Sequence, residues 1–333
     1  MKKWKWLRFE FWPVYVFYLP CIPVWFYYAI RSRDLWYFLK VNPGMKLGGF
    51  MQYSKYDVLA SIPDQFSLQT LRLNKSEIDP DHPPLPFPFI CKPDLGERGL
   101  GVEIVNSKQE LIACLNNGLG PAYILQEFCD SNLEFGVLYH RYPSGKSDVT
   151  SIVQKEFLSI TGDGMSTFEM LVKKEFRARK RLEHLEKKYS HIWYDVLDKD
   201  RTVVIEKIGN HCRGTKFIDR RDLITPELIA VFDQVAGEIP GFHYGRFDLK
   251  LNADNPEFGP DNIHVFELNG VNSEAGHIYD PNMSIWEAYK SVYREFRIVF
   301  EIVKELNAEK KATERTAGVF FKSLYSHLRR RAF

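Results

Sequence analysis

Residues 245–269 read GRFDLKLNADNPEFGPDNIHVFELN, and the arrangement of the whole chain follows from this stretch. Two runs of alternating apolar and polar residues enclose a loop rich in Asn, Asp, Pro and Gly, which predicts two paired strands with a long connection. Arg246 and Asp248 lie two residues apart in the first run, as do Glu267 and Asn269 in the second. Side chains two apart on a strand share a face. If the strands are neighbours, one face presents an arginine, two carboxylates and an amide.

Two interpretations of this face stay open from these residues alone. Two carboxylates and an amide oxygen are hard ligands that suit Mg²⁺, which usually takes one or two protein carboxylates together with substrate phosphates. The same alternation is typical of an ordinary half-exposed sheet whose polar face is solvated. The stretch therefore predicts either a metal-binding face or a plain hairpin.

The composition excludes several classes of protein. A chain of 333 residues is long enough for two domains. Its net charge of +2 creates no field that would favour nucleic acid, so we expect no nucleic-acid partner. Five cysteines without a CxxC pair indicate neither a disulfide framework nor a zinc site, and they favour a reducing compartment.

An aromatic segment near the N-terminus, residues 11–30, reads FWPVYVFYLPCIPVWFYYAI and contains no charged residue. The length would span a bilayer, but three prolines interrupt a helix, and Trp and Tyr prefer the headgroup zone. We therefore expect a shallow or re-entrant hairpin at a membrane; the alternative is an aromatic segment that packs on the soluble domain or forms an oligomer contact. Residues 319–333, VFFKSLYSHLRRRAF, predict a basic amphipathic helix for an anionic surface, or a solvated tail.

A proline-rich linker at residues 79–88 leads into a predicted strand that carries Lys92. A glycine-rich loop between two strand-like runs follows, and it lets backbone N–H groups approach a phosphate, although a plain β-hairpin has the same pattern. The loop contains Gly96, Arg98, Gly99 and Gly101.

Further polar positions follow in order along the chain. The apolar strand at residues 122–128 ends in Gln126, Glu127 and Phe128, and Glu134 starts the next strand, which is the pattern that a purine hinge with a ribose ligand would need. Lys155 lies on a predicted strand over residues 151–160. Arg213 lies in a polar, glycine-containing loop at residues 210–215.

This order of motifs resembles the ATP-grasp superfamily, and within it the D-alanine:D-alanine ligases and cyanophycin-synthetase-like carboxylate–amine ligases. The resemblance covers residues 87–282. It implies an α+β fold of the ATP-grasp type, in which two α+β subdomains hold ATP between antiparallel sheets, here with the aromatic N-terminal segment and a reduced N-terminal domain. The predicted divisions are an aromatic segment at 1–40, a reduced region with the linker at 41–86, an ATP-grasp domain at 87–305 with lobes at 87–125 and 126–305, and a basic tail at 306–333.

The resemblance also implies roles for individual residues. The residues that resemble the ATP ligands are Lys92, Gly96, Arg98, Gly99, Gly101, Gln126, Glu127, Phe128, Glu134 and Lys155. The set that resembles the ligands of two Mg²⁺ ions is Asp248, Glu267 and Asn269. Arg246 and Arg213 match positions that stabilise an acyl-phosphate transition state and phosphate oxygens. The loop that would shape the acceptor pocket offers Ser273, Glu274, His277 and Tyr279.

The activity implied is an ATP- and Mg²⁺-dependent, ADP-forming carboxylate–amine ligase that works through an acyl phosphate. Two alternatives stay open: an ATP-grasp kinase that phosphorylates an alcohol, and a membrane-bound ATP-binding scaffold without turnover. The usual N-terminal domain is reduced to residues 42–86, so D-alanine does not follow as a substrate. We expect small-molecule or lipid-linked carboxylate and amine substrates, and a cytoplasmic protein that is peripheral or monotopic on the cytoplasmic membrane face.

Overall fold

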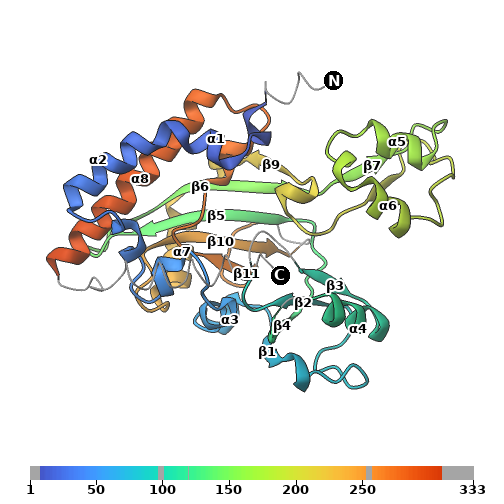
Figure 1. The fold of residues 1–333 in the computed structure, drawn as a ribbon, viewed down its shortest axis with the longest axis horizontal. Coiled ribbons are helices and arrows are strands. Elements are labelled where there is room, and N and C mark those ends of the chain that lie inside the picture. Colours follow the sequence, from blue (N-terminus) through green and yellow to red (C-terminus); the bar gives the residue numbers. More distant parts are fainter. Residues whose placement is uncertain (1–7, 97–100, 119, 253–256, 310–333) are drawn as a thin grey trace.

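The central sheet is assembled from strands that lie far apart in the sequence (Figure 1). In the computed structural model, which describes residues 8–96, 101–118, 120–252 and 257–309, this sheet has the order β11-β10-β5-β6-β9 with every neighbouring pair antiparallel. The strands are β5 (Glu134–Arg141), β6 (Ser147–Glu156), β9 (Lys216–Asp219), β10 (Tyr244–Leu251) and β11 (Ile263–Asn269). The predicted pairing within residues 245–269 is correct: Arg246 lies opposite Asn269, and Asp248 opposite Glu267.

A smaller antiparallel sheet forms the other lobe, in the order β1-β4-β2-β3. Its elements are β1 (Thr70–Asn74), β2 (Phe89–Pro93), β3 (Glu103–Val105), α4 (Lys108–Asn117) and β4 (Ala122–Glu127). Ser107 caps α4 by accepting a hydrogen bond from the Glu110 N–H, as its position before an apolar run leads one to expect. One face packs against α4 through Phe89, Tyr123 and Leu111. The sheet begins earlier than the predicted lobe at 87–125, because β1 comes from the region before the linker.

A third unit projects from the central sheet (right in Figure 1). It consists of β7 (Ser159–Thr161), α5 (Phe168–Lys174), α6 (Leu182–Lys188) and β8 (Thr202–Val204). Its own core gathers around Phe168 and Trp193. The single strand predicted over residues 151–160 is therefore divided: β6 ends at Glu156, and β7 begins the new unit.

The two faces of the central sheet differ. One is covered by α7 (Pro226–Gly237) and by α3 (Lys55–Leu59), with Phe232 and Phe247 in the shared core. On the other face, α8 (Ile285–Ala308) covers the half that carries Tyr244 and Leu138. Arg246 and Asp248 follow Tyr244 at intervals of two, so they lie on this second face beyond α8. The face is apolar under α8 and polar where it approaches the smaller sheet.

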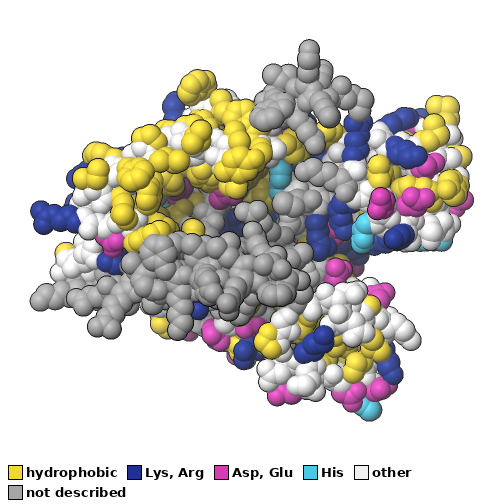
Figure 2. All heavy atoms as spheres, viewed as in Figure 1, with side chains coloured by type: hydrophobic (Ala, Val, Ile, Leu, Met, Phe, Trp, Pro, Cys, Tyr) yellow, Lys and Arg dark blue, Asp and Glu magenta, His cyan; other side chains and the backbone are white. Residues whose placement is uncertain are grey.

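The aromatic N-terminal segment packs along α8 as α1 (Val14–Tyr18) and α2 (Ile22–Ser32). Phe17 stacks on Tyr289, and further along Tyr28 contacts Phe300, so the segment runs parallel to α8 and the predicted hairpin is not formed. The prolines begin helical turns instead of breaking them, since the first turn needs no N–H from them. Hydrophobic side chains gather over this part of the surface (Figure 2).

The expectations about a membrane concern two segments, residues 11–30 and residues 319–333. Among the residues that the structure describes, no helix is long and apolar enough to cross a membrane. The basic stretch at residues 319–333 lies outside the described residues.

Candidate active site

A buried ion-pair cluster links three strands of the central sheet. Lys155 on β6 places its Nζ 2.9 Å from Glu134 Oε1 on β5 and 2.9 Å from Asp248 Oδ1 on β10. The three residues are 5%, 3% and 1% exposed, respectively. Buried charges of this kind persist only when they are paired. The ladder between β5, β6 and β10 brings them together, since Glu134 lies directly opposite Lys155.

Arg246 neutralises the same carboxylate from the other side. Its Nη2 donates to Asp248 Oδ2 at 3.0 Å, and its Nε lies 3.2 Å from both oxygens. Burial alone would raise the pKa of Asp248, but Arg246 and Lys155 outweigh it and hold that pKa well below its usual range. Burial lowers the pKa of Lys155, and Asp248 and Glu134 reverse the effect, so its pKa is raised. Asp248 is therefore ionised and Lys155 is protonated at neutral pH.

The remaining predicted metal ligands lie on β11 beside Asp248. Asn269 donates from Nδ2 to Asp248 Oδ2 at 3.1 Å and accepts at Oδ1 from the Tyr53 hydroxyl at 3.1 Å. Glu267 forms an ion pair with Lys55 at the start of α3. Burial acts to raise the pKa of Glu267, but Lys55 lowers it on balance. Tyr53 and Lys55, the partners of Asn269 and Glu267, both come from the region before the linker.

Lys92 connects the two lobes. From β2 it donates to Gln126 Oε1 at 2.9 Å within the smaller sheet, and to the Phe266 carbonyl of β11 at 3.0 Å. Burial lowers the pKa of Lys92 to about 8, although Glu267 acts in the opposite direction. Within the described part of the chain, Lys92 has no carboxylate among its hydrogen-bond acceptors, an arrangement that favours an anionic ligand.

The oxygen set on β10 and β11 fits Mg²⁺ in its chemistry. Asp248 and Glu267 are cross-strand neighbours and Asn269 is two residues further along, so two carboxylates and one amide share a face. No group of three His, Cys, Asp or Glu side chains suited to a metal occurs among the described residues. A set of only two carboxylates is what Mg²⁺ uses when phosphate oxygens complete its shell. In this structure Lys55, Lys155 and Arg246 balance the carboxylates.

The glycine-rich loop is described only at its two ends. Gly101 has a φ of 72°, a left-handed conformation that favours glycine, and a Cβ there would lie 3.1 Å from the Pro93 side chain. Arg213 donates from Nη2 to the Val102 carbonyl at 2.9 Å, so this predicted phosphate ligand lies at the C-terminal end of the loop. Gly96 ends the described part that follows β2. Arg98 and Gly99 lie outside the described residues.

The predicted adenine hinge lies at the end of β4. Gln126 is buried and binds Lys92, whereas Glu127 is exposed. Phe128 follows, with the ammonium of Lys250 5.4 Å from its ring centroid.

Gly209, in the segment after β8, lies against the side chains of Glu134 and Lys155. A Cβ at Gly209 would lie 2.0 Å from Glu134 Oε1 and 2.8 Å from the Lys155 side chain. Only glycine lets the backbone approach the predicted ribose ligand Glu134 this closely.

The predicted acceptor loop holds a carboxylate between two phenols. Glu274 accepts a hydrogen bond from the Tyr18 hydroxyl at 2.5 Å and from the Tyr279 hydroxyl at 2.8 Å. Burial, and then the charge of Glu274, raise the pKa of Tyr18 well above its usual value, so the phenol keeps its proton and donates. The Glu274 backbone carbonyl lies 3.5 Å from Arg246 Nη1, so the loop meets the polar cluster at this residue. The charge of Glu274 contributes to raising the pKa of Arg246.

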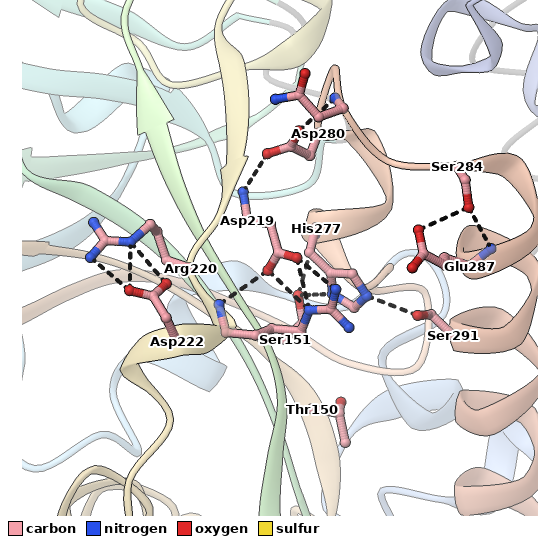
Figure 3. Close-up of polar contacts among 12 residues, drawn as sticks. Thr150, Ser151, Asp219, Arg220, Asp222, His277, Asp280, Ser284, Glu287 and Ser291 are labelled. Atoms are coloured by element: carbon pink, nitrogen blue, oxygen red, sulfur yellow. Dashed lines mark hydrogen bonds and ion pairs between the residues drawn. The ribbon is translucent and has the colours of Figure 1, made fainter.

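The other two residues of that loop are engaged within the protein. Ser273 accepts a hydrogen bond from the Arg246 N–H at 3.1 Å and donates to the Asn269 carbonyl at 2.8 Å, and so it fixes the loop to the strand ends. His277 is fully buried, and its two ring nitrogens lie 2.8 Å from the Ser151 hydroxyl and 2.9 Å from the Ser291 hydroxyl (Figure 3). Burial lowers the pKa of His277 to about 4, so the ring is neutral. Both positions favour a supporting role over direct contact with a substrate.

Sequence reasoning missed four residues of this site: Tyr18, Tyr53, Lys55 and Gly209. Ser54 caps the short helix α3 by accepting a hydrogen bond from the Asp57 N–H. No local pattern shows that this helix docks on β11, because the contact spans 212 residues of sequence. Tyr18 was hidden in a segment assigned to a membrane surface.

No protein-family model matches the chain, and no curated protein matches its sequence. Several solved structures are similar. One is a D-alanine–D-alanine ligase from Bacillus anthracis, with 14% identity, a TM-score of 0.45, and coverage of 80% of this chain and 72% of that one. Others are a D-alanine–D-alanine ligase from Helicobacter pylori (14% identity, TM-score 0.37, 75% and 61% covered) and a bifunctional glutathione synthetase from Pasteurella multocida (14% identity, TM-score 0.38, 74% and 38% covered).

These are ATP-grasp proteins. They belong to the superfamily that the motifs of this chain resemble, and a further similar structure from Bacillus anthracis is complexed with ATP. The chain spans less than two thirds of the length of the Helicobacter and Pasteurella proteins. The highest of the TM-scores is 0.45, so the function proposed below rests on the contacts of this chain's own residues.

Proposed function

We propose that the protein is an ATP- and Mg²⁺-dependent carboxylate–amine ligase that forms an amide through an acyl phosphate and releases ADP. One observation carries the proposal: two antiparallel sheets bring Lys92, Lys155 and Arg246 together with the face formed by Asp248, Glu267 and Asn269. Buried cationic side chains beside a hard-oxygen set are what a metal-bound triphosphate needs.

The nucleotide would lie between the sheets. Lys92 and Lys155 would contact phosphate oxygens, with Arg213 at the end of the glycine-rich loop. The end of β4 at Gln126, Glu127 and Phe128 would meet the adenine, and Glu134 would accept from the ribose hydroxyls. Asp248, Glu267 and Asn269 would hold Mg²⁺, which when bound supplies charge that neutralises phosphate oxygens.

Two displacements would complete the reaction. A carboxylate oxygen attacks the γ-phosphorus, the bond to the β–γ bridging oxygen breaks, and ADP leaves. The ammonium group of the acceptor then loses a proton to solvent, and the resulting amine nitrogen attacks the acyl carbon. The bond to the phosphate oxygen breaks, and the nitrogen loses a second proton to solvent. Arg246 would stabilise the charge on the transferring group, since its guanidinium is already oriented by Asp248.

The acceptor side would be recognised by Glu274. A carboxylate held by two phenols beside Arg246 is suited to the ammonium group of an amine substrate. The Tyr279 ring lies 5.4 Å from the His211 ring and 6.4 Å from the Phe217 ring, so an aromatic wall continues from Glu274 toward β9. These contacts favour an amine with an apolar or aromatic body.

An acceptor screen with coupled detection of ADP and phosphate tests the proposal. Asp248→Asn and Glu267→Gln should each reduce acceptor-dependent turnover by about 100-fold or more. Glu156→Gln should not, because this exposed acid follows Lys155 on the opposite face of β6 and pairs with Lys216. Hydroxylamine should trap the acyl phosphate as a hydroxamate. A stable phosphate ester instead would identify the kinase, and ATP binding without turnover across all acceptors would identify the scaffold.

A further inference from the structure

The outer face of the N-terminal helices is an apolar surface without a partner among the described residues. We define this outer face by its exposed apolar and aromatic side chains, namely Val14, Tyr15, Leu19, Ile22, Phe26, Tyr27 and Ile30. Tyr15, Leu19 and Ile30 are 75%, 64% and 74% exposed. Figure 2 shows hydrophobic side chains gathered where Figure 1 places α1 and α2. Contiguous exposed surfaces of this kind mark sites of interaction.

The inner side of the same helices is packed against the rest of the protein, so the helices are folded in place while their outer face is exposed. Phe17, Cys21 and Ala29 are 3%, 1% and 2% exposed. The Tyr289 hydroxyl of α8 donates to the Phe17 carbonyl at 3.0 Å. None of the residues that the structure describes covers the outer face.

Charge is placed only at the ends of the outer face. Residues 11–30 contain no charged side chain, whereas Arg8 before them and Arg31 and Arg33 after them are exposed. Arg31 donates to the Tyr27 hydroxyl at 3.0 Å, and its guanidinium lies 5.2 Å from the Phe300 ring centroid. This cation is held at the edge of the apolar surface.

A lipid surface fits this pattern better than a protein does. A protein interface has a polar rim and about one hydrogen bond per 100–200 Å², and the outer face offers only the hydroxyls of Tyr15 and Tyr27 as polar side-chain groups. Aromatic and aliphatic residues between basic ends are typical of helices that lie in the plane of an anionic bilayer. The absence of a spanning helix among the described residues agrees with a helix lying in that plane.

We propose that α1 and α2 dock the protein onto an anionic membrane, with the outer face inserted at the headgroup boundary and Arg31 and Arg33 at the lipid phosphates. The proposal does not depend on the ligase activity. Where that activity also holds, Tyr18 joins the docked segment to Glu274, so the amine site would lie next to the membrane.

Vesicle co-sedimentation of the full chain tests the docking. Binding should be strong to phosphatidylcholine vesicles with about 30% phosphatidylglycerol and weaker to phosphatidylcholine alone. The triple variant Tyr15→Ser, Leu19→Ser, Ile30→Ser should partition at least about tenfold more weakly, because it removes exposed apolar area only. A matched control is Met165→Ser, Tyr194→Ser, Val196→Ser, three exposed side chains of the unit around β7 and β8, which should bind as the wild type does.

Three outcomes would overturn the proposal. The first is recovery of the full chain in the supernatant with both kinds of vesicle, and the second is equal binding by the two triple variants. A third is a dimer in light scattering that the outer-face variant alone dissociates, without vesicle binding, since that would show a second copy to be the occupant. Circular dichroism melts should match for all three proteins, so that a loss of binding reports the surface and not the fold.

Discussion

Charged side chains are usually exposed and apolar side chains usually buried, and two regions of this protein reverse that arrangement. Around Asp248, charged side chains are buried and each is paired with an opposite charge. Around Ile30, apolar side chains are exposed, and no described residue covers them. Buried ion pairs seldom stabilise a fold on balance, and exposed apolar surface lowers solubility. Each departure therefore points to a ligand: polar and phosphorylated at the first region, apolar at the second.

The largest expected effect comes from breaking the buried cluster. Lys155→Met leaves Glu134 and Asp248 without their shared cation, which should lower the free energy of unfolding by about 3–5 kcal/mol. Lys216→Met removes a surface pair with Glu156 at 3.9 Å and should cost at most about 1 kcal/mol. Urea denaturation of both variants measures the difference. Equal small effects would show that the cluster is not a buried ion-pair network.

The next effect separates the two sides of the N-terminal helices. Phe17→Ala should cost about 3 kcal/mol, because a buried ring stacked on Tyr289 is lost and α8 limits relaxation. Tyr15→Ala, two residues away and on the outer face, should change the unfolding free energy by no more than about 0.5 kcal/mol. Thermal melts of both variants report this contrast. A mild Phe17→Ala would mean that the segment does not pack on α8 in solution.

The sequence predicted the pairing of β10 and β11 because its cause lies within a few residues. The alternation around Asp248 and Glu267 fixed which side chains share a face. The charge partners were not predictable in the same way. Lys55 meets Glu267 only after the region before the linker docks on β11, and no periodic pattern carries that information.

For the N-terminal segment, composition alone could not predict which molecule covers it. A run of twenty uncharged residues has the same composition whether lipid or protein covers it, so the sequence left both alternatives open. In the structure, Phe17 and Cys21 pack in the core that includes α8, while Leu19 and Ile30 are exposed. The prolines misled the prediction of a hairpin, because Pro13 and Pro23 fit the starts of helices.

A smaller effect concerns pH at the nucleotide site. Since burial lowers the pKa of Lys92 to about 8, the free protein loses this proton as the pH rises, whereas a bound triphosphate favours the ammonium. The affinity for ATP should therefore fall about eightfold between about pH 7.5 and about pH 9. Calorimetric titration of the wild type and of Lys92→Met checks this, and the variant should bind weakly without the pH dependence. An unchanged slope in the variant would assign the proton to another group.

The smallest effect connects the two regions through Tyr18. Tyr18→Phe removes one of the two phenols on Glu274 and should lower the unfolding free energy by about 1 kcal/mol, because water can replace a donor at a half-buried carboxylate. Tyr279→Phe removes the donor on the other oxygen, so the double variant leaves Glu274 with neither. If both phenols hold one carboxylate, the double variant should cost more than the two single losses together. Simple additivity would show that the N-terminal helices and the acceptor loop are independent, and α1 would then have no part in shaping the surroundings of Glu274.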